Sequence, residues 1–409
     1  MKRIFCALAG LVSLAGCNTQ TSPATTPAQA TQAQQAATPA NSPGTDYQVY
    51  RTRLPGQADS VTLHLVTAPR GFDATGTAGR FGSYYGPSGH PYTLQGQPSA
   101  APDSVVLFET SPEKAIDPNG NSLYWRLHRQ PGGDLTGTVG RLPVRLRRLP
   151  PVAGALTFVV YYFADSAAAF PREARSPKAH LSVQALVPVG APAAVRQTLT
   201  TSLLSSLRGD TIDGIPSTSL AELYKQQRRE YFKNYHEDAA DSRPTPADTA
   251  GIGAYAPGLR YENQTATYVL YQQDNLLSLG YFHYDYSGGA HGNYGTTAAS
   301  YDLRTGRRLR YADIFQPAAA QQLPTLLGRA VRALVGLQAD EPLDKQLMVS
   351  QMPVTHNVFL TEGGAVFIYQ PYEIAAYAQG EIRVFLPLSE LRPLLRQGLP
   401  LPGSGVAAR

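Results

Sequence analysis

The stretch LLSLGYFHYDYSGGAHGNYGTTAASYDL, residues 276–303, contains two runs of strand-forming residues separated by a glycine-rich turn. The runs LLSLGYFHYDY (276–286) and AASYDL (298–303) carry the leucine, phenylalanine and tyrosine side chains that strands favour. Between them, residues 284–295 hold four glycines, and glycine adopts left-handed backbone conformations that other residues avoid. The stretch therefore predicts two strands of one sheet, joined by a turn with an unusual backbone.

The composition of the whole chain also favours sheets and turns. Its 409 residues include 37 glycines, 33 prolines and 24 tyrosines, and only 16% are charged, which excludes a coiled coil. At roughly 150 residues per domain, the length allows two or three domains with real cores. The formal net charge of +5 includes Lys2 and Arg3, and no basic run resembles a phosphate-binding stripe. We therefore expect no nucleic-acid partner.

The first seventeen residues predict export and lipid attachment. Two basic residues precede an apolar run, 4–14, that is too short for a stable membrane-spanning helix and is typical of an export signal. The run ends in Leu-Ala-Gly-Cys at 14–17, which resembles the bacterial lipoprotein signal, in which the cysteine is acylated and becomes the mature N-terminus. We therefore predict a signal peptide over 1–16 and lipidation of Cys17. The alternative is an ordinary secretory signal cleaved nearby, with Cys17 incidental.

Cysteine usage and the following segment agree with an exported, anchored protein. The other cysteine, Cys6, lies inside the predicted signal, so the mature chain has no disulfide, and cysteine catalysis and cysteine-ligated zinc are excluded. Residues 17–45 carry no charge and no aromatic side chain, and we expect a disordered tether with an r.m.s. span of about 30 Å. Because no acidic cluster follows Cys17, we expect a cell-envelope protein on the periplasmic face of the outer membrane, with the cell surface as the alternative.

Residues 46–150 predict an antiparallel β-domain. Short strand patterns such as SVTLHLV (60–66) and SVVLFET (104–110) alternate with turns rich in glycine and proline. Two loosely similar stretches, beginning at Gly79 and at Gly133, indicate two hairpins of similar design. The pattern leaves a meander, a sandwich and a small barrel open.

Residues 151–250 predict an α/β segment with two helices. Two strand patterns precede a helical stretch over 193–207, and a second helix begins at the capping box formed by Ser219 and Glu222. The exposed side of this second helix carries four basic residues, which fit a solvated amphipathic helix better than a nucleic-acid-binding one. Residues 251–409 predict a C-terminal α+β domain. The predicted fold class is therefore α+β, with mostly antiparallel sheet.

Three separated motifs in the C-terminal part resemble those of a known family. They are a glycine-rich turn, a hairpin and a tyrosine-rich crossing: Gly288, Gly289, Ala290, His291, Gly292 and Asn293; Tyr301, Asp302, Leu303, Thr305, Gly306, Asp313 and Phe315; and Pro371, Tyr372, Glu373, Ile374, Tyr377 and Gly380. Over residues 155–396 their order resembles the extracytoplasmic region of the RsiV-type anti-sigma factors and their uncharacterised lipoprotein relatives. The resemblance implies an α/β segment, also found beside bacterial polysaccharide deacetylases, joined to a C-terminal domain.

The resemblance also implies a binding function. In the RsiV-type proteins this ectodomain binds lysozyme, and binding exposes the protein to proteolysis that frees a sigma factor. We expect a protein or glycan ligand here, lysozyme-like or peptidoglycan-related. We do not expect anti-sigma signalling, because the sequence shows a lipoprotein signal and neither a transmembrane helix nor a sigma-binding segment. Residues 46–150 have no counterpart in the family pattern.

The histidine of the glycine-rich turn allows two interpretations. In an enzyme, His291 is a general base oriented by Asp285 or Glu373, and the chain is an envelope hydrolase. In the interpretation that we favour, the glycines supply backbone shape, while His291 and Asn293 hydrogen-bond backbone groups in a crowded bend. The sequence has no G-x-S-x-G elbow, no H-E-x-x-H motif and no deacetylase motif. His283, Asp285 and His291 lack further matching metal ligands, so we expect no metal, no cofactor and no catalytic residue.

The sequence thus predicts a monomeric, lipid-anchored binding protein without catalytic activity, attached to the membrane through Cys17. Tyrosines concentrate around the three motifs, where exposed rings with polar tips suit protein or glycan binding. The alternative is that they fill the core of a chain that is poor in phenylalanine and tryptophan. The predicted ligand surface consists of twelve motif residues: Gly288, Gly289, His291, Gly292, Asn293, Asp302, Thr305, Gly306, Pro371, Tyr372, Glu373 and Tyr377.

Overall fold

The computed structural model describes residues 40–69, 79–99, 101, 103–111, 113–114, 122–208, 219–242 and 258–402. All of these belong to one compact unit, Pro39–Arg409. The predicted signal peptide at 1–16, Cys17 and most of the predicted tether lie outside the described residues. In the part of the chain that is described, no helix is long and apolar enough to cross a membrane.

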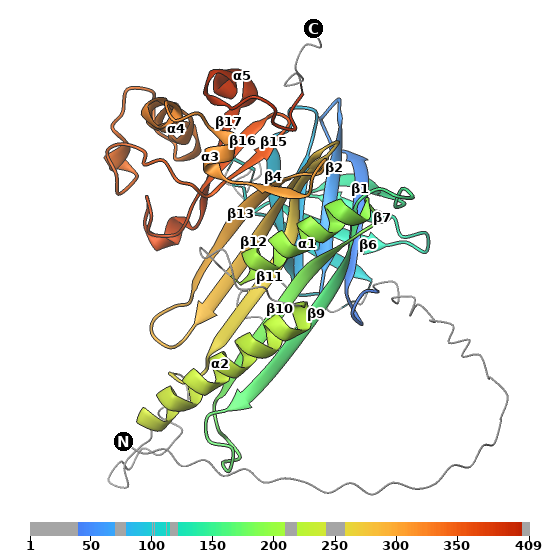
Figure 1. Cartoon of the computed structure of the whole chain (residues 1–409), viewed down its shortest axis with the longest axis vertical. Helices are drawn as coiled ribbons and strands as arrows, with labels where there is room; N and C mark the ends of the chain where they lie inside the picture. Colours follow the sequence, from blue (N-terminus) through green and yellow to red (C-terminus); the bar gives the residue numbers. More distant parts are fainter. Residues whose placement is uncertain are drawn as a thin grey trace, which may run out of the picture. The chain divides into compact units, whose positions relative to one another are not determined.

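The N-terminal strands form a closed eight-stranded barrel (Figure 1). Each strand pairs antiparallel with the next one along the chain, and the last strand pairs back onto the first, with Val49 opposite Leu149. The strands are β1 (Asp46–Arg53), β2 (Ser60–Thr67), β3 (Arg80–Tyr85), β4 (Pro91–Gln97), β5 (Ser104–Glu109), β6 (Tyr124–Arg129), β7 (Leu135–Val139) and β8 (Leu142–Leu149). Of the three arrangements that the sequence left open, the small barrel is the one observed.

Apolar and polar residues alternate along the barrel strands, so that apolar side chains fill the interior and polar side chains face solvent. On β8, Val144 and Leu146 are buried, whereas Arg145 and Arg147 point outward and are exposed. Trp125 on β6 is fully buried in the barrel core. This two-residue period is the pattern expected of strands with one buried face.

A six-stranded sheet follows, in the order β14-β13-β12-β11-β10-β9. Its strands are β9 (Thr157–Ala168), β10 (Lys178–Val189), β11 (Glu262–Gln273), β12 (Leu276–Tyr286), β13 (Asn293–Asp302) and β14 (Arg307–Leu309). All neighbours pair antiparallel except β10 and β11, which are parallel. A parallel pair needs a crossover connection, and here the connection contains two helices.

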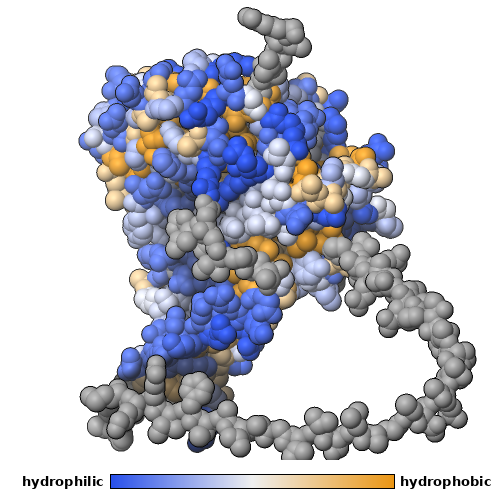
Figure 2. Space-filling model, viewed as in Figure 1, coloured by the Kyte–Doolittle hydropathy of each residue, from blue (hydrophilic) through white to orange (hydrophobic). Residues whose placement is uncertain are grey.

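The two helices are α1 (Ala193–Leu207) and α2 (Leu220–Asp241). The hydroxyl of Ser219 caps α2 by accepting the Glu222 backbone N–H at 3.1 Å, which is one of the two hydrogen bonds of the predicted capping box. The helix buries Leu223, Phe232, Tyr235 and Ala239. Its outward side is mostly hydrophilic in Figure 2, so α2 has the form of a solvated amphipathic helix.

The C-terminal part builds a second core around a three-stranded antiparallel sheet, β15-β16-β17. The amphipathic α4 packs against β17. The elements are α3 (Tyr311–Ile314), α4 (Ala319–Leu334), η2 (Leu343–Lys345), β15 (Val358–Thr361), β16 (Gly364–Tyr369), η3 (Tyr377–Gln379), β17 (Ile382–Pro387), α5 (Leu388–Leu391) and η4 (Arg392–Leu394). The whole arrangement confirms the predicted α+β class with mostly antiparallel sheet.

The barrel is joined to the six-stranded sheet by buried polar contacts. Ser83 on β3 donates from Oγ to the Val269 carbonyl at 2.7 Å, and the Tyr85 hydroxyl donates to the Gln272 carbonyl at 2.5 Å. The buried ring of His64 lies between the hydroxyls of Tyr47, 2.8 Å from Nδ1, and Tyr85, 3.0 Å from Nε2. Burial lowers the pKa of His64 to about 3, so the ring is neutral and bridges the two tyrosines.

Candidate functional site

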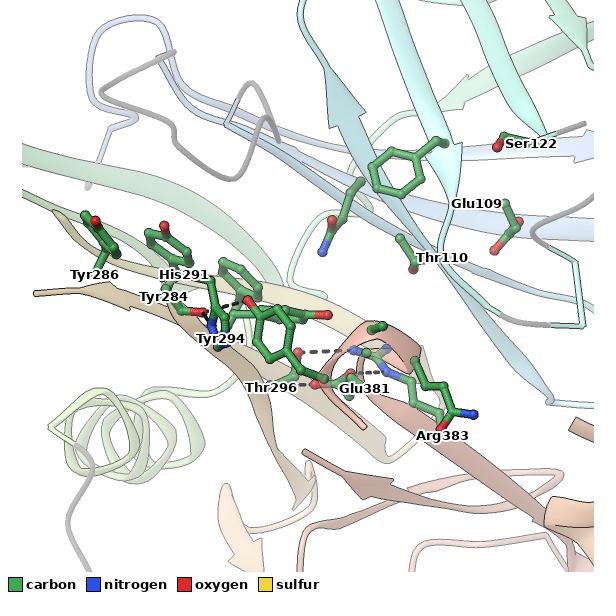
Figure 3. A pocket seen from close by; sticks show the side chains of 18 of the residues that line it. Glu109, Thr110, Ser122, Tyr284, Tyr286, His291, Tyr294, Thr296, Glu381 and Arg383 are labelled. Carbon is green, nitrogen blue, oxygen red and sulfur yellow. Dashed lines mark hydrogen bonds and ion pairs between the residues drawn. The ribbon is translucent and has the colours of Figure 1, made fainter. Parts of the chain in front are cut away.

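A cavity of about 850 Å³ lies where the barrel, the six-stranded sheet and the C-terminal part meet (Figure 3). We call it the groove. The barrel lines one side with Glu109, Thr110 and Ser122, which stand opposite the other labelled side chains in Figure 3. The far side is lined by aromatic residues around the glycine-rich turn and by polar residues of the C-terminal part: Phe282, Tyr284, Tyr286, Tyr294 and Tyr377; and Gln379, Glu381 and Arg383.

Glycines give the turn between β12 and β13 its shape. Gly288 and Gly289 have φ values of 93° and 95°, in the left-handed region. A Cβ atom on Gly292 would lie 2.5 Å from the Tyr284 ring. The turn therefore favours glycine for its backbone angles at 288 and 289, and a side chain at 292 would displace the ring of Tyr284, which lines the groove.

His291 is exposed at the rim of the groove. Its Nδ1 lies 3.1 Å from the Gly292 carbonyl, its Nε2 lies 3.2 Å from the Tyr372 hydroxyl, and its ring stacks on Tyr377 with 3.9 Å between centroids. Because a carbonyl oxygen only accepts, Nδ1 is a donor, and in the neutral imidazole Nε2 accepts from Tyr372. The ring is thus held by one carbonyl and two tyrosines.

Neither carboxylate of the hydrolase hypothesis contacts His291. Asp285 accepts a hydrogen bond from the Asn263 side chain at 3.0 Å, and Glu373 accepts one from the Gln370 backbone N–H at 2.9 Å. The hypothesis needs one of these groups within hydrogen-bond reach of the imidazole. The structure places His291 at a cavity, but it places neither Asp285 nor Glu373 within hydrogen-bond reach of the imidazole.

The tyrosine-rich crossing meets the glycine-rich turn. Tyr377 donates from its hydroxyl to the Gly292 carbonyl at 2.6 Å. Tyr372 is 52% exposed and has a φ of 71°, which is strained for a tyrosine. Pro371 is half-buried beside it, and Asn293 is exposed at the start of β13; neither lines the groove. Two predicted motifs, far apart in the sequence, therefore form one surface through His291, Tyr372 and Tyr377.

The third predicted motif lies elsewhere. Asp302 accepts hydrogen bonds from the backbone and guanidinium of Arg304, while its carbonyl accepts the Gly306 N–H at 2.7 Å. The Thr305 hydroxyl donates to that same carbonyl at 3.4 Å. Gly306 has a φ of 77°, and a Cβ there would lie 2.4 Å from the Val195 carbonyl of α1. These residues shape a hairpin that packs on α1, and none of them lines the groove.

A buried ion pair in the groove, between Arg383 and Glu381, was not predicted. Arg383 donates from Nε to Glu381 at 2.6 Å, and from Nη2 to the hydroxyls of Tyr268 at 2.9 Å and Thr296 at 3.2 Å. The second Glu381 oxygen accepts the Thr296 backbone N–H at 2.6 Å. Although burial pulls the pKa of Arg383 down, the ion pair with Glu381 outweighs it and raises that pKa above its ordinary value. A signal was present: Arg383 interrupts the apolar run IRVFLP.

Glu109, on the barrel side of the groove, was not predicted either. It is 3% exposed, its Oε2 accepts from the Tyr84 hydroxyl at 2.8 Å, and its Oε1 accepts the Ser111 N–H at 3.4 Å. Burial raises the pKa of Glu109 to about 8 against the opposing effect of these hydrogen bonds. A carboxyl at the end of the apolar run SVVLFE was the available sequence signal.

Metal-ligating side chains do not gather in the described part of the chain. No group of three or more histidine, cysteine, aspartate or glutamate residues there is placed to hold an ion. His283 is exposed on β12, and its Nδ1 lies 3.4 Å from the Thr265 hydroxyl.

Two family models match separate parts of the chain. Residues 187–294 match the family described as Deacetylase PdaC, and residues 312–389 match the family described as Protein of unknown function (DUF3298). No curated protein matches. The glycine-rich turn lies in the first matched region and the tyrosine-rich crossing in the second, whereas the barrel side of the groove lies outside both.

Solved structures of DUF3298-family proteins resemble part of the chain. One from Bacteroides fragilis has 24% identity and a TM-score of 0.51, and the match covers 60% of this chain and 95% of that protein. One from Pseudomonas aeruginosa has 19% identity and a TM-score of 0.41, with 59% and 95% covered. The match to the RsiV-type ectodomain itself stays a prediction. The chain carries a PdaC-like region followed by a DUF3298-like region, and about 60% of it shares the fold of the B. fragilis protein.

Proposed function

We propose that the protein is a lipid-anchored binding protein of the bacterial cell envelope and that the groove takes a glycan ligand, peptidoglycan-related in kind. The observation that carries this proposal is the tyrosine-lined cavity of about 850 Å³, which lies within the usual size range of ligand pockets. Aromatic rings provide flat apolar area, and their hydroxyls, with nearby amide and carboxylate groups, provide hydrogen bonds. That combination suits a sugar, whose faces are apolar and whose edges carry hydroxyls.

Binding is favoured over hydrolysis by the surroundings of His291. The hydrolase hypothesis needs Asp285 or Glu373 beside the imidazole, and the contacts of the ring are instead a carbonyl, the Tyr372 hydroxyl and the Tyr377 ring. The word deacetylase in the description of the matched family belongs to that family, and we do not extend the activity to this chain. The proposal has the chain acting as a monomer, with a membrane and a glycan as its partners and no nucleic acid.

The ligand proposal is tested by cosedimentation of the purified full-length chain with peptidoglycan sacculi. We expect the chain to pellet with sacculi and the groove variant Tyr286→Ala to pellet less. Tyr161→Ala provides a matched control, because Tyr161 is equally half-buried but lies on β9 outside the groove. Equal pelleting of both variants, or no pelleting of the unaltered chain, contradicts the glycan proposal. Lysozyme is tested alongside, and its capture without sacculus binding would assign the surface to a protein ligand.

The anchor is tested separately. Cells that express the chain are labelled with a clickable fatty acid and fractionated. We expect label on the unaltered chain in the outer-membrane fraction and no label on Cys17→Ala. An unlabelled parent chain would mean that Cys17 is incidental and that the protein is secreted in soluble form.

A further inference from the structure

Four exposed arginines share the outer face of the barrel, where β1 pairs with β8. We call them the arginine face, and they are Arg51 and Arg53 on β1 and Arg145 and Arg147 on β8. Arg51 lies directly opposite Arg147 in the strand register. Their strand neighbours Tyr50 and Leu146 are buried in the barrel core, so the two-residue period of a strand turns all four arginines outward.

Acidic groups neutralise only part of this face. Asp134 pairs with Arg145, with 2.9 Å between its Oδ2 and Nη2 of the arginine. Among the described residues, no carboxylate forms an ion pair with Arg51, Arg53 or Arg147. Like charges directly opposite each other on an antiparallel pair repel, so the pairing of Arg51 with Arg147 does not stabilise the barrel by itself. A bound anion would offset this repulsion.

The shape of the arginine face fits an extended array of anions. Side chains on neighbouring strands lie about 5 Å apart, and those two residues apart on one strand about 7 Å, so the four guanidinium groups are spread over the barrel wall. The outer wall of a barrel is convex, whereas sites for small ligands are concave. A guanidinium group takes two oxygens of one phosphate at once. The face therefore suits a surface that offers many phosphates.

Two exposed apolar side chains flank the same strand. Leu142 begins β8 and is 56% exposed, and Val152 follows the end of β8 and is 73% exposed. Only four large apolar side chains are exposed in the described part of the chain, and these are two of them. A lipid surface offers acyl chains directly beneath its phosphates, so it has a place for apolar side chains beside cations. A soluble polyanion has no such place.

The arginine face and the groove lie on opposite sides of the barrel. Around the closed barrel, β8 and β1 are four strands away from β4 and β5. These two strands carry Gln95 and Glu109, which line the groove. A membrane that contacted the arginine face would therefore leave the barrel side of the groove turned away from the lipid.

We propose that the arginine face docks on the phosphate headgroups of an anionic lipid membrane. This surface is separate from the groove, and the choice of a membrane as its partner rests on the proposed anchor at Cys17. The predicted tether over 17–45, with an r.m.s. span of about 30 Å, leads into β1. Attachment over that span raises the effective concentration of the barrel at the membrane. Docking then fixes the orientation of an anchored globule.

The test is flotation of the purified full-length Cys17→Ala chain with lipid vesicles, so that no acyl chain attaches the protein. We expect binding to vesicles that contain phosphatidylglycerol and phosphatidylcholine, weak binding to phosphatidylcholine alone, and loss of binding at high salt, which screens exposed charges. Equal binding to both vesicle types overturns the proposal. Binding to alginate, a soluble anionic polysaccharide, without binding to anionic vesicles assigns the face to a glycan and also overturns it.

Paired substitutions test the arginine face itself. In Arg51→Gln/Arg147→Gln we expect affinity for the anionic vesicles to fall at least tenfold, because each arginine near an anionic surface contributes several-fold. Arg172→Gln/Arg175→Gln is the matched control, because it removes the same charge from two exposed residues between β9 and β10, outside the barrel. Equal losses in the two pairs contradict the proposal.

A second pair keeps the charge. Arg51→Lys/Arg147→Lys should retain most of the vesicle binding, and a loss as large as in the glutamine pair contradicts docking through charge. Should the glutamine pair fail to fold, the two vesicle types and the salt dependence decide. A failed vesicle test leaves standing the glycan proposal, which sacculi test, and the anchor, which fatty-acid labelling tests.

Discussion

The glycine-rich turn before β13 and the hairpin after it are both glycine-containing motifs. They differ in how exposed their polar side chains are and in what those side chains contact. Both depend on glycines with left-handed backbone angles. At the hairpin, Asp302 is 8% exposed and its hydrogen bonds all serve the turn itself. At the turn, His291 is exposed at the rim of the groove, within reach of the tyrosines. Of two similar glycine motifs, one therefore shapes a packed backbone and the other exposes side chains beside a cavity, and burial separates the two.

The largest effect is expected from placing a side chain at Gly306. Gly306→Ala combines an unfavourable φ with a Cβ 2.4 Å from the Val195 carbonyl, so we expect a loss of about 3 kcal/mol in the free energy of unfolding. Urea denaturation followed by circular dichroism measures it. Gly336→Ala is the control, because it has a similar φ of 71° and open space around the Cβ, and about 1 kcal/mol is expected there. Equal losses at the two sites would mean that the contact with α1 is unimportant.

A substitution in the groove is expected to lower ligand affinity more than stability. Tyr377→Ala removes the ring under His291 and part of the groove wall, so we expect glycan affinity to fall roughly tenfold, about 1.4 kcal/mol. Cosedimentation of the folded variant with sacculi measures it. Asp302→Asn provides the contrast, since it should lower stability and leave affinity unchanged. Weaker binding by Asp302→Asn would break the distinction between the two motifs.

The protonation of Glu109, on the barrel side of the groove, is tested by the pH dependence of stability. The folded protein keeps the Glu109 proton up to about pH 8, whereas an unfolded glutamate releases it near a pKa of about 4.3. Unfolding therefore releases a proton between these values, and stability falls as pH rises, by at most about 1.4 kcal/mol per pH unit.

In the Glu109→Gln variant, this decrease in stability with rising pH should be absent. Denaturation of both proteins from pH 5 to 9 gives the difference in stability between them. Taking the difference cancels His64, whose pKa burial lowers to about 3, so that its contribution is lost as pH falls instead. A constant difference would show that the Glu109 carboxyl is ionised in the folded state.

The smallest effect is expected at His291. His291→Ala removes one stacked ring and two hydrogen bonds at an exposed site, so we expect a two- to fivefold loss of affinity, about 0.5–1 kcal/mol. Cosedimentation with sacculi measures it. Release of soluble fragments from sacculi by the unaltered chain, abolished in this variant, would make the protein an enzyme and reverse the proposal.

Local patterns predicted most of the elements. The helix over 193–207 and the cap at Ser219 follow from periodicity and from hydrogen-bonding chemistry within one turn, and both are observed. Closure of the barrel was left open, because the pairing of β1 with β8 depends on register between strands almost a hundred residues apart. Local periodicity holds no information on that register.

Only part of the candidate site was predicted, again because contacts between distant strands cannot be read from local sequence patterns. His291, Tyr372 and Tyr377 belong to motifs that the sequence displays, and the structure brings them together. Glu109 and Arg383 are charges in apolar strands, and the tyrosine hydroxyls that they contact, those of Tyr84 and Tyr268, lie on other strands. A charge in a buried strand signals a polar network, but only the fold reveals which network it joins.

The parallel pairing of β10 with β11 has a consequence for the order of folding. Most barrel strands pair with their sequence neighbours, whereas this pair must close a crossover that includes α1 and α2. Distant pairings form more slowly than neighbouring ones. In a chain that emerges N-terminus first, the barrel strands can pair before β12 and β17 are in place. The groove is lined by all three parts, so this cavity is complete only when the C-terminal part has folded.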